Sequence, residues 1–186
     1  MTTNRVVLGI ALCGLGLSTT SCSKTVQASQ PTLNVVSAAL TPGATIPTEY
    51  TCDGVNISPA LKWSNPPTST QSVAIVCEDP DAPSGDFTHW IVYNIPPTIH
   101  RLPEHVPNDA TLTSGARQGQ NDFEHIGYGG PCPPPGPDHH YHFRVYALDK
   151  RLTLPDNAVR ADIDNAIQGH ILAQGELMVT YGRSSS

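Results

Sequence analysis

Asp79-Pro80-Asp81-Ala82-Pro83, followed by His89-Trp90, is the stretch around which this chain is organised. Apolar runs rich in β-branched residues flank it at residues 72–77 and 91–95, and they predict two strands buried in one core. Proline fixes its own φ and restricts the residue before it, so this loop is rigid. A rigid acidic loop with a histidine at its far end predicts a functional site. The alternative interpretation is a proline-rich turn whose aspartates are solvated.

A second proline-stiffened loop covers residues 127–136 (GYGGPCPPPG) and leads into residues 139–148 (HHYHFRVYAL). As a strand, the latter places His139 and Tyr141 on one face and the more polar His140 and His142 on the other. This pattern predicts a half-buried antiparallel strand whose histidine lies at the loop end. Backbone N–H groups near Gly129 and Gly130 are expected to be free to cradle an anion.

Outward from these loops, most of the chain favours strands and irregular connections. Short strands are predicted at residues 33–36, 60–63 and 176–181, and the proline- and glycine-rich residues 96–138 predict a long irregular region. Only residues 157–173 show a helical period, with Asp156 or Asn157 as the cap. The expected fold is therefore mainly β with one C-terminal helix.

The composition and charge of the chain argue against some classes of function. The 186 residues include 18 Pro and 15 Gly, only 14% are charged, and the formal net charge is −6. This size supports one domain with a sizeable core. Because the chain is acidic and carries no run of Lys or Arg, long-range attraction to nucleic acid or to an anionic membrane surface is not expected.

The N-terminal residues predict export. Arg5 precedes an apolar run at residues 6–17 that is too short to span a bilayer, and small residues then lead to Cys22. This pattern resembles a lipoprotein signal, although Thr19 stands where Leu is usual. We expect a signal peptide at residues 1–21, a flexible tether at 22–32 and one domain at 33–183. A lipidated Cys22 would anchor the domain to the membrane outside the cytoplasm; secretion without a lipid is the alternative.

Three cysteines remain in the domain. Export implies an oxidising compartment, so one disulfide and one thiol are expected. Cys77 lies within an apolar run and is predicted to be a small buried residue. Cys52 and Cys132 both lie in Gly- and Pro-containing loops, and we predict that they pair.

Several separated motifs together resemble the phosphatidylethanolamine-binding protein family, which includes the Raf kinase inhibitor protein, and in particular its bacterial YbhB/YbcL branch. The motifs are residues 79–83, His89-Trp90, residues 94–96, residues 127–136 and residues 139–141, and the resemblance covers residues 34–183. It implies a Greek-key antiparallel β-sandwich with a small anion pocket at one end. By position, the implied ligand-binding residues are Asp79, Pro80, Asp81, Pro83 and His89 in the first loop and Gly130, Pro131, His139 and Tyr141 in the second.

One position departs from the family pattern. The family often has His-Arg-Tyr where this chain has His139-His140-Tyr141. Losing an arginine from the pocket would remove a permanent charge and make anion binding sensitive to pH. Strand alternation instead places His140 outside the pocket, and we favour that interpretation.

The function implied by the resemblance is non-catalytic binding of a small anion, such as a phosphate or a phospholipid head group, without a cofactor. The alternative is an inhibitor or modulator of a partner kinase or serine protease, acting through the same region. A zinc site at His139, His140 and His142 is disfavoured because His139 points away from the other two on a strand. Hydrolysis is disfavoured because the chain has no Gly-x-Ser-x-Gly and Ser84 has no evident base.

Overall fold

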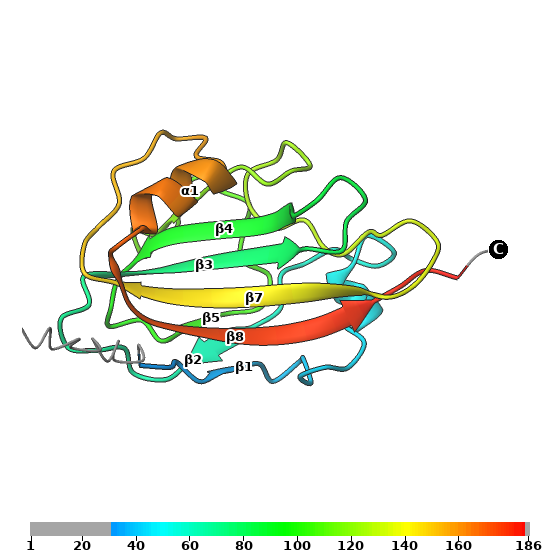
Figure 1. The fold of residues 1–186 in the computed structure, drawn as a ribbon, viewed down its shortest axis with the longest axis horizontal. Coiled ribbons are helices and arrows are strands. Elements are labelled where there is room, and N and C mark those ends of the chain that lie inside the picture. Colours follow the sequence, from blue (N-terminus) through cyan, green and yellow to red (C-terminus); the bar gives the residue numbers. More distant parts are fainter. Residues whose placement is uncertain (1–30, 185–186) are drawn as a thin grey trace, which may run out of the picture.

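A computed structural model describes residues 31–184 as two antiparallel sheets and one helix (Figure 1). The predicted signal peptide and most of the predicted tether, including Cys22, lie outside the described residues. The larger sheet has the strand order β6-β4-β3-β7-β8 and the smaller has the order β1-β2-β5. The mainly β prediction is confirmed. The bounds of the strands are β1 Val35–Val36, β2 Leu61–Trp63, β3 Ser72–Asp79, β4 Phe87–Ile95, β5 Arg101–Leu102, β6 Arg117–Gln118, β7 His139–Leu148 and β8 Ile171–Tyr181.

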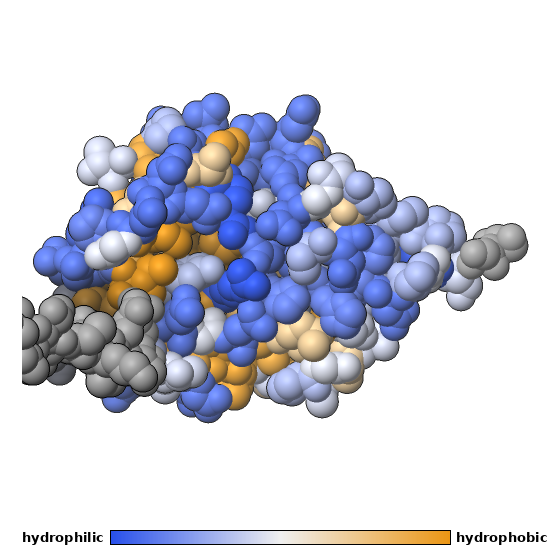
Figure 2. Space-filling model, in the orientation of Figure 1, coloured by the Kyte–Doolittle hydropathy of each residue, from blue (hydrophilic) through white to orange (hydrophobic). Residues whose placement is uncertain are grey.

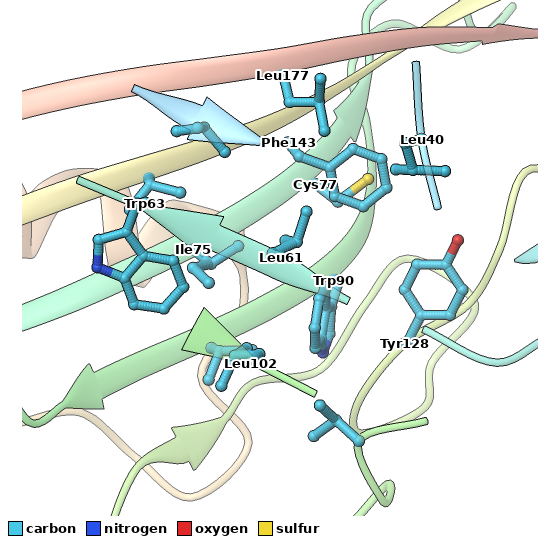
Figure 3. Packing of buried hydrophobic residues seen from close by; sticks show 14 of the residues in the cluster. Leu40, Leu61, Trp63, Ile75, Cys77, Trp90, Leu102, Tyr128, Phe143 and Leu177 are labelled. Carbon is cyan, nitrogen blue, oxygen red and sulfur yellow. The ribbon is translucent and has the colours of Figure 1, made fainter. Parts of the chain in front are cut away.

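The main core lies between the two sheets. Figure 3 shows side chains of the smaller sheet, such as Leu61 and Trp63, facing Ile75, Trp90 and other residues of the larger sheet. The two runs predicted from the sequence form β3 and β4, which pair along most of their length. All of β3 and nearly all of β4 are buried, as expected of continuous apolar runs. Cys77 is a buried free thiol in this core, as predicted.

Helix α1 (Arg160–Ile167) covers the outer face of the larger sheet and forms a second apolar cluster with β3, β4 and β7. The predicted helix at residues 157–173 was too long at both ends. The cap of α1 is Val159, so the prediction of Asp156 or Asn157 was wrong; the backbone N–H of Val159 donates to the Asp162 carboxylate at 3.0 Å. Gly169, with φ of +77°, lies in the turn after the helix. Strand β8 begins at Ile171, because its pairing with β7 extends as far as Leu148, the last residue of β7.

Strand β7 is an interior strand of the larger sheet, since β3 and β8 flank it. The predicted alternation holds at its first half, where His139, Tyr141 and Phe143 are buried and His140 is exposed. Its last residues are buried on both faces because α1 covers them. The rest of this outer face is mainly hydrophilic (Figure 2). A 3-10 turn, η1 (Thr48–Tyr50), completes the described elements, and none of the described helices is long and apolar enough to cross a membrane.

Candidate functional site

A cavity of about 310 Å³ lies at the end of the larger sheet where β3 ends and β7 begins. We call this end the pocket end, and the end covered by α1 the helix end (Figure 1). The two loops emphasised by the sequence meet here, and His89 and His139 line the same cavity. The full lining is Asp79, Ala82, Pro83, Ser84, Phe87, His89, Phe123, Cys132, Pro133, Pro134, His139 and Tyr141.

His139 and Asp79 form a buried pair at the base of the cavity. The His139 Nδ1 lies 2.8 Å from the Asp79 Oδ2, and their side chains are 11% and 4% exposed. The other Asp79 oxygen accepts the backbone N–H of Asp81 at 2.9 Å. Because a carboxylate can only accept, Nδ1 carries the proton and Nε2 is the ring nitrogen left for a ligand.

His89 is held in a similar way by the second loop. Its Nδ1 lies 2.7 Å from the Gly129 carbonyl oxygen, so Nδ1 donates and Nε2 is again left over. Burial lowers the pKa of His89, only partly offset by that carbonyl and by the charge of Asp79. At neutral pH the ring is therefore uncharged and presents a lone pair at Nε2.

Tyr141 supplies the clearest sign of an unmet interaction. Its side chain is fully buried, and its hydroxyl forms no well-aligned hydrogen bond with a described residue, although the Asp79 carboxylate lies close to it. Burial raises the pKa of Tyr141, and so do the negative charge of Asp79 and the contact of the hydroxyl with that carboxylate, so the hydroxyl keeps its proton. A buried donor without a well-aligned acceptor lowers the stability of the fold. The Tyr141 side chain lines the cavity, where a ligand could supply that acceptor.

An aromatic wall that the sequence did not reveal forms one side of the cavity. Phe87 and Phe123 pack edge to face with ring centroids 4.8 Å apart, and His89 lies 5.1 Å from Phe87 and 5.4 Å from Phe123. Phe87 begins β4, but Phe123 comes from the irregular region at residues 119–127. Its backbone N–H donates to the Asn121 side chain, which fixes the turn that carries the ring.

Other predicted residues lie beside the cavity without lining it: Pro80, Asp81, Gly130 and Pro131. The expectation of free amides in the second loop was wrong. The Gly129 N–H donates to the His89 carbonyl at 2.9 Å, and the Gly130 N–H donates to Asn56 Oδ1 at 2.8 Å. These bonds hold the loop against the sandwich, so neither N–H group is free to bind an anion.

His140 lies outside the cavity, as strand alternation predicted. Its side chain is exposed, and its Nδ1 lies 2.7 Å from Asp81 Oδ2. The same carboxylate oxygen accepts the backbone N–H of His140. These two bonds hold the pKa of Asp81 below its ordinary value. Because His140 stands where the family often has arginine, that position lies outside the cavity, and the absence of the arginine removes no charge from the lining.

The predicted disulfide is confirmed. Cys52 and Cys132 are bonded, with Cα atoms 5.4 Å apart, and Cys132 is part of the cavity lining. The backbone N–H of Cys52 also donates to the Pro131 carbonyl. The bridge thus fixes one wall of the cavity to the start of the domain. Within residues 31–184, no three His, Cys, Asp or Glu side chains gather as metal ligands.

Comparison with known proteins assigns the family. A sequence profile described as phosphatidylethanolamine-binding protein matches residues 36–182. The chain belongs to this family. A UPF0098 protein of Methanothermobacter thermautotrophicus is 46% identical over 151 residues, which cover 81% of this chain and 99% of the relative. A UPF0098 protein of Aquifex aeolicus is 45% identical over 153 residues, covering 81% of this chain and 89% of the relative.

Solved structures agree with this assignment. YbcL of Escherichia coli, described as a member of the mammalian PEBP family, has a TM-score of 0.77 at 36% identity and covers 82% of this chain and 99% of its own. A PEBP homologue from Chlamydia trachomatis has a TM-score of 0.74 at 38% identity with the same coverage. The family-level part of the sequence analysis is thereby confirmed, as is the likeness to YbcL.

Proposed function

We propose that this PEBP-family protein is a non-catalytic binding protein whose cavity takes a small oxyanion of the phosphate type. The observation that carries the proposal is the buried hydroxyl of Tyr141, which forms no well-aligned hydrogen bond with any residue of the described range 31–184. It is a donor in a cavity that also contains His89 and His139, whose Nδ1 atoms are both engaged. A tetrahedral oxyanion offers several acceptors, and one of them would satisfy this hydroxyl.

The charges in the cavity set a condition on this binding. Asp79 is negative and repels an anion, and neutral His89 has no N–H at Nε2 to offer. Binding of a phosphate should therefore take up a proton, either on His89 or on the phosphate. In the first case Nε2 becomes a charged donor; in the second a P–OH group donates to the Nε2 lone pair. Both routes make binding tighter as the pH falls.

The aromatic wall indicates that the ligand also carries an apolar group. Phe87 and Phe123 offer apolar ring surface beside the polar base. A cavity of about 310 Å³ is at the lower end of the range for ligand pockets. It suits a phosphomonoester or a lipid head group better than whole acyl chains.

Hydrogen bonding around the cavity supports a role in binding rather than catalysis. In the described part of the chain, no serine or cysteine side chain is hydrogen-bonded to an imidazole, the arrangement that activates a nucleophile. The only free thiol among residues 31–184 is Cys77, whose pKa is raised by burial, which disfavours the reactive thiolate.

We also propose that the domain acts at the cell envelope, anchored through a lipid on Cys22. The sequence at residues 5–22 supports export, and the Cys52–Cys132 bridge is typical of proteins that fold in an oxidising compartment. Mass spectrometry of the purified native protein tests this: diacylated Cys22 at the mature N-terminus is expected, and Cys22→Ser should be released into the soluble fraction. A mature chain that still begins at Met1 would contradict it.

Calorimetric titration with phenyl phosphate, phosphoethanolamine and inorganic phosphate tests the binding proposal. Tyr141→Phe should weaken binding about tenfold or more, because the hydroxyl bonds a charged group. His170→Ala, which removes a histidine at the helix end, is the matched control and should bind normally. Phenyl phosphate should bind more tightly than inorganic phosphate if the aromatic wall contributes. If no probe binds, or Tyr141→Phe binds as the wild type does, the pocket proposal is wrong and a protein-modulating role is favoured.

A further inference from the structure

The outer face of the smaller sheet carries an unusual row of side chains. Val36, Lys62 and Arg101 lie directly opposite one another on β1, β2 and β5, and all three are exposed. Their neighbours Leu61 and Leu102 point into the core (Figure 3), so alternation turns Lys62 and Arg101 outward. This face is on the opposite side of the smaller sheet from the core.

The two cations stand out against the charge of the domain. Of the ten Lys and Arg residues, Arg5 and Lys24 lie outside the described residues, which leaves eight cations against sixteen Asp and Glu. Arg117, Arg144, Arg160 and Arg183 each pair with a carboxylate. The other four, Lys62, Arg101, Lys150 and Arg151, form no ion pair with a described carboxylate. Lys62 and Arg101 differ from the other two in lying directly opposite each other on neighbouring strands. Like charges directly opposite on a sheet are unfavourable, and an anionic group placed between them would reverse that.

Two hollows flank β5 and share Arg101, Leu102 and Pro103. One, of about 550 Å³, is also lined by Val36, Ala38 and Lys62. The other, of about 200 Å³, is also lined by Ile99, Val106 and Leu112. We call the pair of hollows the β5 trough. Its walls combine apolar side chains with two cations, Lys62 and Arg101, and one carboxylate, Asp109.

Strand β5 is also the edge of its sheet. The backbone N–H of Trp63 donates to the His100 carbonyl at 3.0 Å, which makes Lys62 and Arg101 the non-hydrogen-bonded pair of the ladder. The backbone N–H and C=O of Arg101 therefore face away from β2, and they form no backbone bond to another described residue on that side. An unpaired edge is a template for another extended chain.

We propose that the β5 trough is a docking site for an extended acidic segment of a partner protein, which adds to the sheet beside β5. Main-chain bonds form at Arg101. Alternate side chains of the segment are carboxylates that lie on the outer face beside Arg101, with Lys62 next to it across β5. The side chains between them are apolar and face the smaller hollow, lined by Ile99, Val106 and Leu112. A trough between hollows fits a strand better than a flat membrane. An anionic bilayer would also meet the whole domain, whose described residues carry eight more negative than positive charges. The proposal does not depend on the pocket.

The probe is a synthetic peptide of about six residues, a common strand length, with alternating Val and Glu, titrated into the full chain by calorimetry. Lys62→Glu/Arg101→Glu should weaken its binding about tenfold or more, since two attractions become repulsions. Lys150→Glu/Arg151→Glu is the matched control, because these two cations are also without carboxylate partners and the change in net charge is the same. The control variant should bind as the wild type does.

Two further peptides and vesicles of anionic lipid distinguish docking of an acidic strand from the alternatives. A Val-Lys peptide of the same length should not bind, and a Val-Glu peptide with one central proline should bind more weakly, because proline cannot donate a main-chain bond. Amide hydrogen exchange should show new protection at Arg101. The proposal is overturned if the Val-Glu peptide does not bind, if both double variants lose affinity equally, or if the chain binds only vesicles of anionic lipid.

Discussion

The two ends of the larger sheet each hold a histidine–aspartate pair with the same separation and a different environment. At the pocket end, His139 and Asp79 lie 2.8 Å apart with side chains 11% and 4% exposed. At the helix end, His170 and Asp149 also lie 2.8 Å apart, but are 38% and 43% exposed. Solvent screens an exposed pair and leaves it worth little, whereas a buried pair cannot lose one member cheaply. Distance alone therefore does not identify a functional pair; burial beside a cavity does.

The largest difference between the ends should come from the disulfide at the pocket end. The bridge joins residues 80 positions apart, and closing a loop of that length stabilises a fold by about 4.5 kcal/mol in the chain-entropy model. Cys52→Ala/Cys132→Ala should lower the free energy of unfolding in urea by about that amount. Hydrogen exchange should show protection lost first at residues 127–136. Equal or greater loss in α1 would contradict the division into two ends.

The two histidine–aspartate pairs give the next largest effect. His139→Ala leaves the Asp79 carboxylate buried without its partner and should lower the free energy of unfolding by about 3 kcal/mol. His170→Ala removes the exposed pair and should cost less than about 1 kcal/mol. Urea unfolding of both variants with the disulfide intact makes the comparison. Similar losses in the two variants would show that burial does not distinguish the ends.

A pH dependence should follow from His89. Burial lowers the pKa of His89 in the folded protein below its ordinary value of 6.5. The unfolded chain then binds the proton more readily, so this residue's contribution is fully present above pH 6.5 and is lost as the pH falls below it. His89→Gln should flatten the fall in stability between about pH 7 and pH 5. His170→Gln should not, and chemical denaturation at several pH values measures both.

The smallest expected effect belongs to the helix end. Asp162 accepts the backbone N–H of Val159 at the start of α1, and losing a cap of this kind costs about 1 kcal/mol. Asp162→Ala should therefore lower thermal stability slightly and leave ligand binding unchanged. Asp164→Ala, which breaks only the exposed pair with Arg160, should cost about half as much or less. A change in ligand affinity in either variant would mean that the two ends are coupled.

The sequence located much of the pocket because short motifs and strand alternation are local signals. Asp79, His89, His139 and Tyr141 follow from the rigid loops and from the alternation in β7. Phe123 could not be found, because a single aromatic residue in an irregular loop has no periodicity. The hydrogen bond of the Gly130 N–H could not be predicted either, since its acceptor, Asn56, is 74 residues away.

The helix end was less predictable for a related reason. Residues 171–173 fit a helical stripe as well as a strand, and only pairing with β7 decides between them. The length of β7 is a property of the whole sheet, which local propensity does not encode. The same limit applies to the β5 trough, because Lys62 and Arg101 become neighbours only through the register of β2 and β5.

Nitrogen NMR of the histidine rings during a phenyl phosphate titration tests the central claim most directly. At a pH where free His89 is neutral, bound ligand should move its ring nitrogens toward the protonated pattern, or hydrogen-bond its Nε2 while the ring stays neutral. In both cases Nε2 of His89 shifts and the His170 ring does not. A saturating ligand that leaves the His89 ring unchanged, or shifts His170 as strongly, would contradict a binding site at the pocket end.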